Sequence, residues 1–141
     1  MKSGIKSNIR VQVTLRFVGD NVDSEVITSK IGLQPSRSHL KGELVTAYPG
    51  RVYPTGLWSF DSTISHHSSF EDHLINLLDV MESKASVIQE LKGLGMQPNF
   101  YCGYFVGQET IESYIKLGID TLERMARIGV SLDLHIYYVE D

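Results

Sequence analysis

The stretch IRVQVTLRFV at residues 9–18 constrains the fold more than any other part of the sequence. Ile9, Val11, Val13, Leu15 and Phe17 alternate there with polar or charged residues. Successive side chains of a β-strand point to opposite faces, so a period of two predicts a strand with one buried face and one face in water. The chain therefore needs a sheet that is covered on one side only.

Further strands are predicted by later segments. GLWSFDS at 56–62 places Trp58 and Phe60 on one side, NFYCGYFVG at 99–107 is aromatic and apolar, and SLDLHIYYVE at 131–140 alternates again. Residues 44–48 predict a short strand inside a long connection that is rich in proline and glycine.

Helices are predicted between these strands. Asp23 is placed to cap a short helix that stops at Gly32, and Pro35 follows that stop. A capping box of Ser68 and Glu71 opens a helix with an apolar stripe, which breaks near 83 and resumes until 93. The stripe consists of Phe70, Leu74, Leu77, Leu78 and Met81.

A last helix is expected from a cap at Thr110 to a stop at Gly129, with Gly118 in close contact with the sheet. Its inner face would use Ile111, Ile115, Leu122 and Met125.

The segments RFVGDNVDSEVITSKIGL and YFVGQETIESYIKLGIDTLERMARIGVSL share the order strand, Phe-Val-Gly, helix, Ile-Gly. This echo predicts an α+β fold, a ferredoxin-like split β-α-β duplication with a helical insert between its halves. The sheet would be antiparallel with its helices on one face. The length of 141 residues fits a single domain spanning 1–141.

The uncovered sheet face is one candidate site. It would present Arg10, Gln12, Thr14, Arg16, Asp133, His135 and Tyr137. We expect Arg10, Arg16, His135 and Tyr137 to meet a protein partner or a second copy in a homodimer. The alternative is a solvated face, which antiparallel sheets tolerate.

The loop at 34–56 is the other candidate. It carries three cations, Arg37, Lys41 and Arg51, against the single anion Glu43. Arginine forks beside aromatic rings suit a carboxylate or phosphate, so the loop predicts a site for a small anionic ligand. Its residues are Arg37, His39, Lys41, Glu43, Arg51 and Trp58. The alternative is a solvated loop anchored by Trp58.

Composition narrows the class of protein. A net charge of -4 and a pI near 5.7 argue against general nucleic-acid binding. No apolar run approaches the roughly 18 residues of a membrane helix, and the first residues lack the apolar core of a signal peptide. The lone Cys102 cannot form an internal disulfide, which fits a cytoplasmic location.

No specific catalytic motif is present: there is no P-loop, no dinucleotide fingerprint, no nucleophile elbow and no cysteine pair. Cys102 lies inside a predicted strand, where a buried thiol is typical. The histidines and carboxylate of HHSSFEDH at 66–73 match no standard metal spacing. We therefore expect no metal, no cofactor and no catalytic residues.

Several of these features together resemble a family. The opening strand, GDNVDSEVITSKIGLQPS, KGE, GLW and the closing LDLHIYY strand are similar to the bacterial domain-of-unknown-function family numbered 4279. The motif residues would be Pro35, Gly42, Glu43, Gly56 and Trp58. The resemblance covers nearly the whole chain and implies a small α+β cytosolic protein without an established activity.

Two hypotheses about function follow. The first is a non-enzymatic interaction protein, in one form an immunity-type inhibitor, that presents Asp61, Glu71, Asp72 and Asp79 to a basic partner. The second is a small-ligand regulatory domain similar to ACT domains, which would bind its ligand with the loop up to Trp58. An enzyme that uses Arg37, His39 and Glu43 ranks third.

Overall fold

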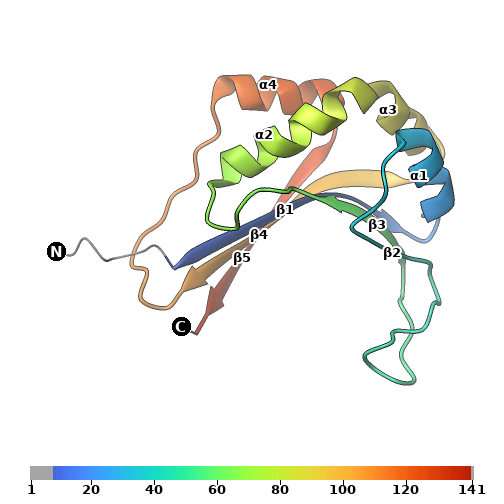
Figure 1. The fold of residues 1–141 in the computed structure, drawn as a ribbon, viewed down its shortest axis with the longest axis horizontal. Helices are drawn as coiled ribbons and strands as arrows, with labels where there is room; N and C mark the ends of the chain where they lie inside the picture. Colours follow the sequence, from blue (N-terminus) through green and yellow to red (C-terminus); the bar gives the residue numbers. More distant parts are fainter. Residues whose placement is uncertain (1–7, 141) are drawn as a thin grey trace.

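A computed structural model describes residues 8–140 as a sheet with a layer of helices on one side (Figure 1). In this part of the chain, five strands form a single sheet in the order β2-β3-β1-β4-β5. Their bounds are β1 Ile9–Gly19, β2 Arg37–His39, β3 Gly56–Asp61, β4 Gln97–Gly107 and β5 Ser131–Val139.

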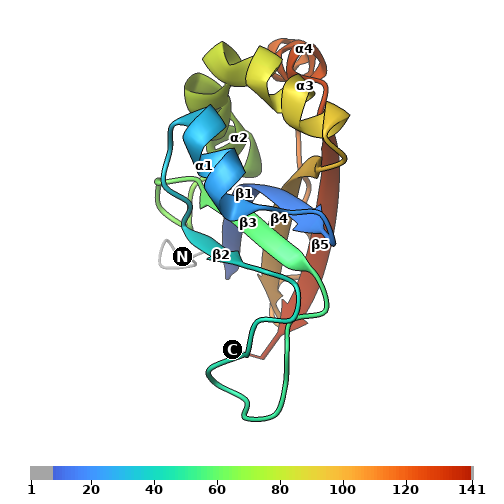
Figure 2. The same cartoon turned by 90° about the vertical axis from the view of Figure 1, so that its right-hand side faces the viewer.

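The helices pack against one face of this sheet, as Figures 1 and 2 show from two sides. They are α1 Ser24–Ile31, α2 Phe70–Met81, the single 3-10 turn η2 Glu82–Lys84, α3 Ala85–Gly93 and α4 Ile119–Ile128. The helix predicted after residue 68, with a break near 83 and an end at 93, is present as α2, η2 and α3. None of the helices in residues 8–140 has the length and apolar character needed to cross a bilayer.

Strand directions correct the predicted topology. β1 is antiparallel to both β3 and β4, but β4 and β5 are parallel neighbours. The sheet is mixed, so the prediction of a purely antiparallel sheet is wrong. The ferredoxin-like duplication is not confirmed, because a split β-α-β unit needs another strand between its parallel pair. Parallel neighbours require a long crossover, which α4 supplies.

The core lies between the inner face of β1 and the helices. Val11, Val13 and Leu15 are buried against α2 and β4, whereas Phe17 packs in a second cluster with α1 and Trp58. The alternation in residues 9–18 is thus confirmed, since each apolar side chain points to the helices.

The last helix begins later than predicted, at Ile119 rather than after Thr110. Gly118 has an extended conformation and is the residue that precedes the helix, so its place inside a helix is wrong. Its N–H donates to the Glu71 carboxylate at the start of α2, which ties the segment to that helix. The N-cap of α2 is Ser69 rather than the predicted Ser68, and its hydroxyl accepts from the Asp72 N–H.

The long connection contains more structure than sequence patterns predicted, but the short strand expected at 44–48 is only a single bridging residue, Leu44. Arg37–His39 form the short edge strand β2, and a ribbon follows at residues 42–53, joined by the bridge between Leu44 and Val52. This ribbon projects away from the sheet (Figure 1). The long connection begins after Gly32, whose positive φ of 78° ends α1 as predicted.

Trp58 lies in the core rather than beside the loop's charges. It is fully buried on β3, packs edge-on against Phe17, and donates its indole N–H to the Thr28 hydroxyl at 3.0 Å. The bond joins α1 to the sheet. Because no surface of Trp58 is left for a ligand, its role is structural.

We expect the Thr28→Val variant to lower the free energy of unfolding by about 1–3 kcal/mol, because the shape is kept but the buried indole N–H loses its acceptor. Urea unfolding followed by the fluorescence of the single tryptophan measures this. The exposed neighbour Ser29→Ala is the matched control and should stay within about 0.5 kcal/mol of the parent. Equal midpoints for both variants would contradict this role.

Candidate functional site

The face of the sheet turned away from the helices gathers most of the polar and aromatic side chains of the strands. Residues paired across neighbouring strands share a face. The registers therefore place one set of residues together, which we call the outer face. Its members are Arg10, Gln12, Thr14, Arg16, Arg37, Ser59, Asp61, Asn99, Tyr101, Gly103, Phe105, Asp133, His135 and Tyr137.

Tyr101 on β4 is the centre of this face. Its hydroxyl lies 2.8 Å from the Tyr137 hydroxyl and 3.2 Å from Nδ1 of His135. The Arg16 guanidinium carbon stands 4.0 Å from the centre of its ring, within the range of a cation–π contact. One phenol thus joins side chains from β1, β4 and β5.

The contacts continue on both sides of Tyr101. Arg16 donates through Nε to the Asn99 side-chain oxygen at 3.1 Å, and the Asn99 amide donates to Asp133. The His135 ring stacks on Tyr137 with centroids 3.9 Å apart, and Phe105 stacks on the other side of Tyr137 at 4.7 Å. These contacts hold the side chains in fixed positions relative to one another.

The Tyr101 phenol stays neutral over the physiological range. Burial and then the hydrogen bond with Tyr137 raise its pKa to about 12. It therefore remains able both to donate and to accept a hydrogen bond. That is the chemistry of a recognition residue rather than of a base.

A hollow of about 320 Å³ opens on the outer face beside this network. Gly103 forms part of its lining beside the stacked Phe105 and Tyr137 rings, and a Cβ at Gly103 would lie 3.1 Å from the Phe105 ring. The Arg37 guanidinium borders the hollow without a hydrogen bond or ion pair to any residue in 8–140. Asp61, Ser62 and His66 complete the polar part of the lining.

A serine–histidine pair lies at the border of this hollow. The Ser62 hydroxyl is 2.5 Å from Nδ1 of His73, which is fully buried on α2. Nε2 of His73 has no hydrogen-bond partner in the described part of the chain. Burial lowers the pKa of His73, so the ring is held in its neutral form.

The predicted loop residues do not meet in one pocket. Arg37 faces the hollow, whereas His39 stacks on Tyr53 at 3.5 Å at the base of the ribbon. Lys41 pairs with Asp20 at 3.1 Å, and Arg51 lies over Tyr48 in the ribbon.

Glu43 accepts from the Leu40 N–H, so it too is part of the ribbon's own structure. Together with the buried Trp58, this divides the predicted set between the outer face, the ribbon and the core.

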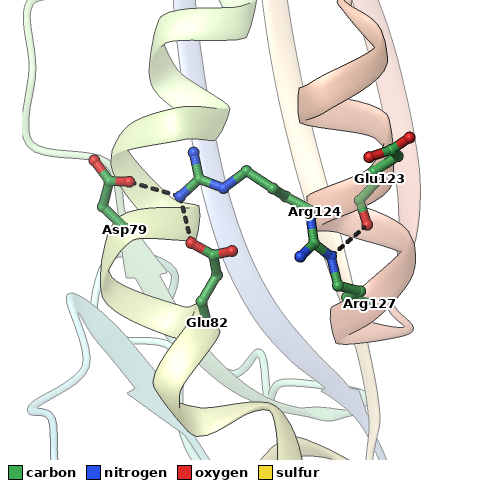
Figure 3. Close-up of polar contacts among 5 residues, drawn as sticks. All are labelled: Asp79, Glu82, Glu123, Arg124 and Arg127. Carbon is green, nitrogen blue, oxygen red and sulfur yellow. Dashed lines mark hydrogen bonds and ion pairs between the residues drawn. The ribbon is translucent and has the colours of Figure 1, made fainter.

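The four carboxylates expected to meet a basic partner are only partly free to do so. Arg124 on α4 pairs with Asp79 at 2.6 Å and with Glu82, as Figure 3 shows. These bonds lower the pKa of Glu82 and join α4 to α2 and η2. Glu71 is also occupied, because it accepts from Gly118 and Thr121, which lowers its pKa.

The four residues predicted for the sheet face do share it. Arg16, His135 and Tyr137 join the Tyr101 network, and Arg10 sits beside Phe105 in the register. Sequence reasoning missed Asn99, Tyr101 and Phe105, because the strand NFYCGYFVG looked buried throughout. Its alternate positions were the available signal, since Phe100, Cys102 and Tyr104 are buried on the inner side.

Within residues 8–140 no group of three histidine, cysteine or carboxylate side chains is arranged to hold a metal ion. His66 faces the hollow and His73 the core, so the HHSSFEDH stretch is divided between two environments.

The comparisons with known proteins give one match. The model of a family described as "Domain of unknown function (DUF4279)" matches residues 7–139. No curated protein and no solved structure matches the chain.

We expect the stability of the chain to fall as the pH drops below about 6.5. Burial lowers the pKa of His73 in the folded chain, whereas unfolded histidine titrates near about 6.5. The unfolded state binds the proton first, so acid favours unfolding and the loss disappears above that pH. Urea unfolding at several pH values between about 5 and 8 measures how the free energy of unfolding changes with pH.

The His73→Gln variant should flatten this slope, whatever its effect on absolute stability. His67→Gln, which removes an exposed imidazole from the same region, is the matched control. An unchanged slope for His73→Gln would show that another group controls the acid response.

Proposed function

Because the chain belongs to the DUF4279 family, whose description names no activity, we propose its function from the geometry of the outer face. The protein is a non-enzymatic interaction module that binds an acidic segment of a partner protein on this face.

The observation that carries the proposal is the Tyr101 network. Interface residues that contribute most to affinity are enriched in tyrosine and arginine, and they lie in ordered clusters. Arg16, Tyr101 and Tyr137 form such a cluster on a sheet face that no helix covers. Ordering before contact reduces the entropy lost on binding.

Charge supports an acidic partner rather than the basic one expected from the overall charge of the chain. The outer face carries Arg10, Arg16 and Arg37 against Asp61 and Asp133, and Asp133 already accepts from Asn99. In a chain with a net charge of -4 this face is locally cationic. An acidic segment would be attracted to it and repelled by the rest of the surface.

Within residues 8–140 no complete catalytic constellation is formed, which supports a non-enzymatic role. In the described residues no carboxylate is hydrogen-bonded to the His73 ring, so the Ser62–His73 pair lacks the third, orienting member of a triad. Cys102 is buried, which raises the pKa of its thiol to about 12 and leaves it unreactive.

The setting proposed is the bacterial cytoplasm, and an immunity-type inhibitor is one form that such a module takes. A lone, buried thiol fits a reducing compartment.

We expect affinity capture from the protein's own host at low salt to recover a partner that the Arg16→Glu bait loses. Reversing this charge removes the cation on the Tyr101 ring and repels an acidic segment, so affinity should fall at least tenfold, about 1.4 kcal/mol. Quantitative mass spectrometry of the two captures measures the difference.

Arg127→Glu is the matched control, because it makes the same charge change on α4, on the helix side of the molecule (Figure 3). Its capture should match that of the parent chain. Identical captures by the parent and Arg16→Glu would refute binding through the outer face.

A second candidate function is the binding of a small anionic ligand in the hollow. The specific observation in its favour is the Arg37 guanidinium, which has no polar partner within residues 8–140 and borders a space of about 320 Å³ that Tyr101 and Tyr137 also line. This keeps the ligand class expected from the loop but moves the site to the outer face.

A thermal-shift screen of nucleotides and acidic amino acids tests the second candidate. We expect an anionic compound to raise the melting temperature of the parent chain and of Arg51→Ala, which removes an arginine from the ribbon. Arg37→Ala should lose the shift, because the ligand's anion loses its partner. No shift with any compound would argue against this site.

A further inference from the structure

The two edges of the sheet are very different. The β2 edge has three residues and presents Arg37 and His39, both features by which proteins protect a free edge. The β5 edge has nine residues, and no strand in the described part of the chain pairs with its outer side. A long edge strand offers a row of backbone donors and acceptors to another strand.

The helix-side face of β5 is apolar and poorly covered. Leu134 and Ile136 leave 43% and 44% of their surface exposed, and Tyr138 leaves 79%. Ile136 and Tyr138 also line a shallow hollow of about 380 Å³ with the exposed Ile111 and Tyr114 of the segment before α4. Apolar surface that adjoins a free strand edge is typical of an interface.

The sequence of β5 is complementary to itself in one antiparallel register. With Leu134 opposite its own copy, Leu132 faces Ile136, and Val130, the residue just before the strand, faces Tyr138, so every pair on the helix side is apolar. On the other side, Asp133 faces His135 in both halves of the pair. The register thus matches apolar with apolar side chains and an acid with a basic ring twice.

We infer that β5 pairs with the β5 strand of a second copy of this chain, antiparallel about a two-fold axis at Leu134. The partner is another copy because a two-fold interface requires one surface to complement itself, which this strand does. The two sheets become one continuous sheet, and the apolar row with Ile111 and Tyr114 is covered.

This dimer does not depend on the proposed function. It also differs from the homodimer expected from the sequence, which would use the outer face rather than the edge of the sheet. The edge arrangement leaves the Arg16–Tyr101 contact of both copies open to a partner.

Light scattering on the full chain tests the dimer directly. At about 100 μM, a hundred times a micromolar dissociation constant, we expect twice the 15.8 kDa chain mass. Leu134→Lys should return the mass to that of one chain, because two ammonium groups would meet at the axis. Leu94→Lys changes another exposed leucine, at the end of α3, and should leave the dimer intact.

Lysine is common on free edge strands, so Leu134→Lys should remain folded, and circular dichroism verifies this. A parent chain with the mass of one copy would overturn the inference. So would a dimer that persists in Leu134→Lys, or one that only Arg16→Glu dissociates, since the outer face would then be the interface.

Cross-linking tests the register. Oxidation of the Leu134→Cys variant should produce a disulfide-linked dimer, because residues opposite each other in an antiparallel pair lie within disulfide range. Ile136→Cys should cross-link far less, since its neighbour would be Leu132 of the other copy. Cys102 is buried and does not compete. Preferential cross-linking through Ile136→Cys would overturn this register.

Discussion

Strand β1 is the constraint on which the rest of the structure depends. It is the central strand, hydrogen-bonded to β3 on one edge and to β4 on the other, and its inner residues enter both hydrophobic clusters. Each face of β1 therefore has one fixed environment. A shift of one residue in its pairing would expose Val11, Val13 and Leu15 to water and bury Arg10 and Arg16, so the register admits no alternative.

The outer face follows from this same register. Once β1 and β4 pair as they do, Arg16 comes beside Asn99, and Tyr101 comes beside Thr14. The parallel pairing of β5 then brings Asp133 and His135 to the same neighbourhood. Three strands, β1, β4 and β5, thus place polar side chains on one surface, where Arg16, Asn99, Tyr101, Asp133, His135 and Tyr137 contact one another. The helix layer is tied separately by Arg124, whose ion pairs lie on the opposite side of the sheet.

Local patterns in the sequence identified what local chemistry decides. The alternation of residues 9–18, the stop at Gly32 and the buried apolar stripe of α2 are all as expected. The predicted start of the last helix at Thr110 was wrong, although the apolar spacing of 111–125 suits a helix. Gly118 is extended and donates to Glu71, and the helix begins only after it. Trp58 misled in another way: a tryptophan near charged residues looked like a ligand contact, but its indole N–H finds its acceptor on α1.

The sequence by itself determined that this chain forms an α+β domain with a one-sided sheet, and that Arg10, Arg16, His135 and Tyr137 lie on the open side. Periodicity carries that information, because a side chain's face follows from its position along its own strand. Only the tertiary structure decided that β5 lies parallel beside β4 and that Tyr101 contacts both Arg16 and Tyr137. It also decided that Arg37 lies at the outer face, apart from Lys41 and Arg51. Strand order and neighbours depend on contacts between distant residues, and no local spacing records which strands meet.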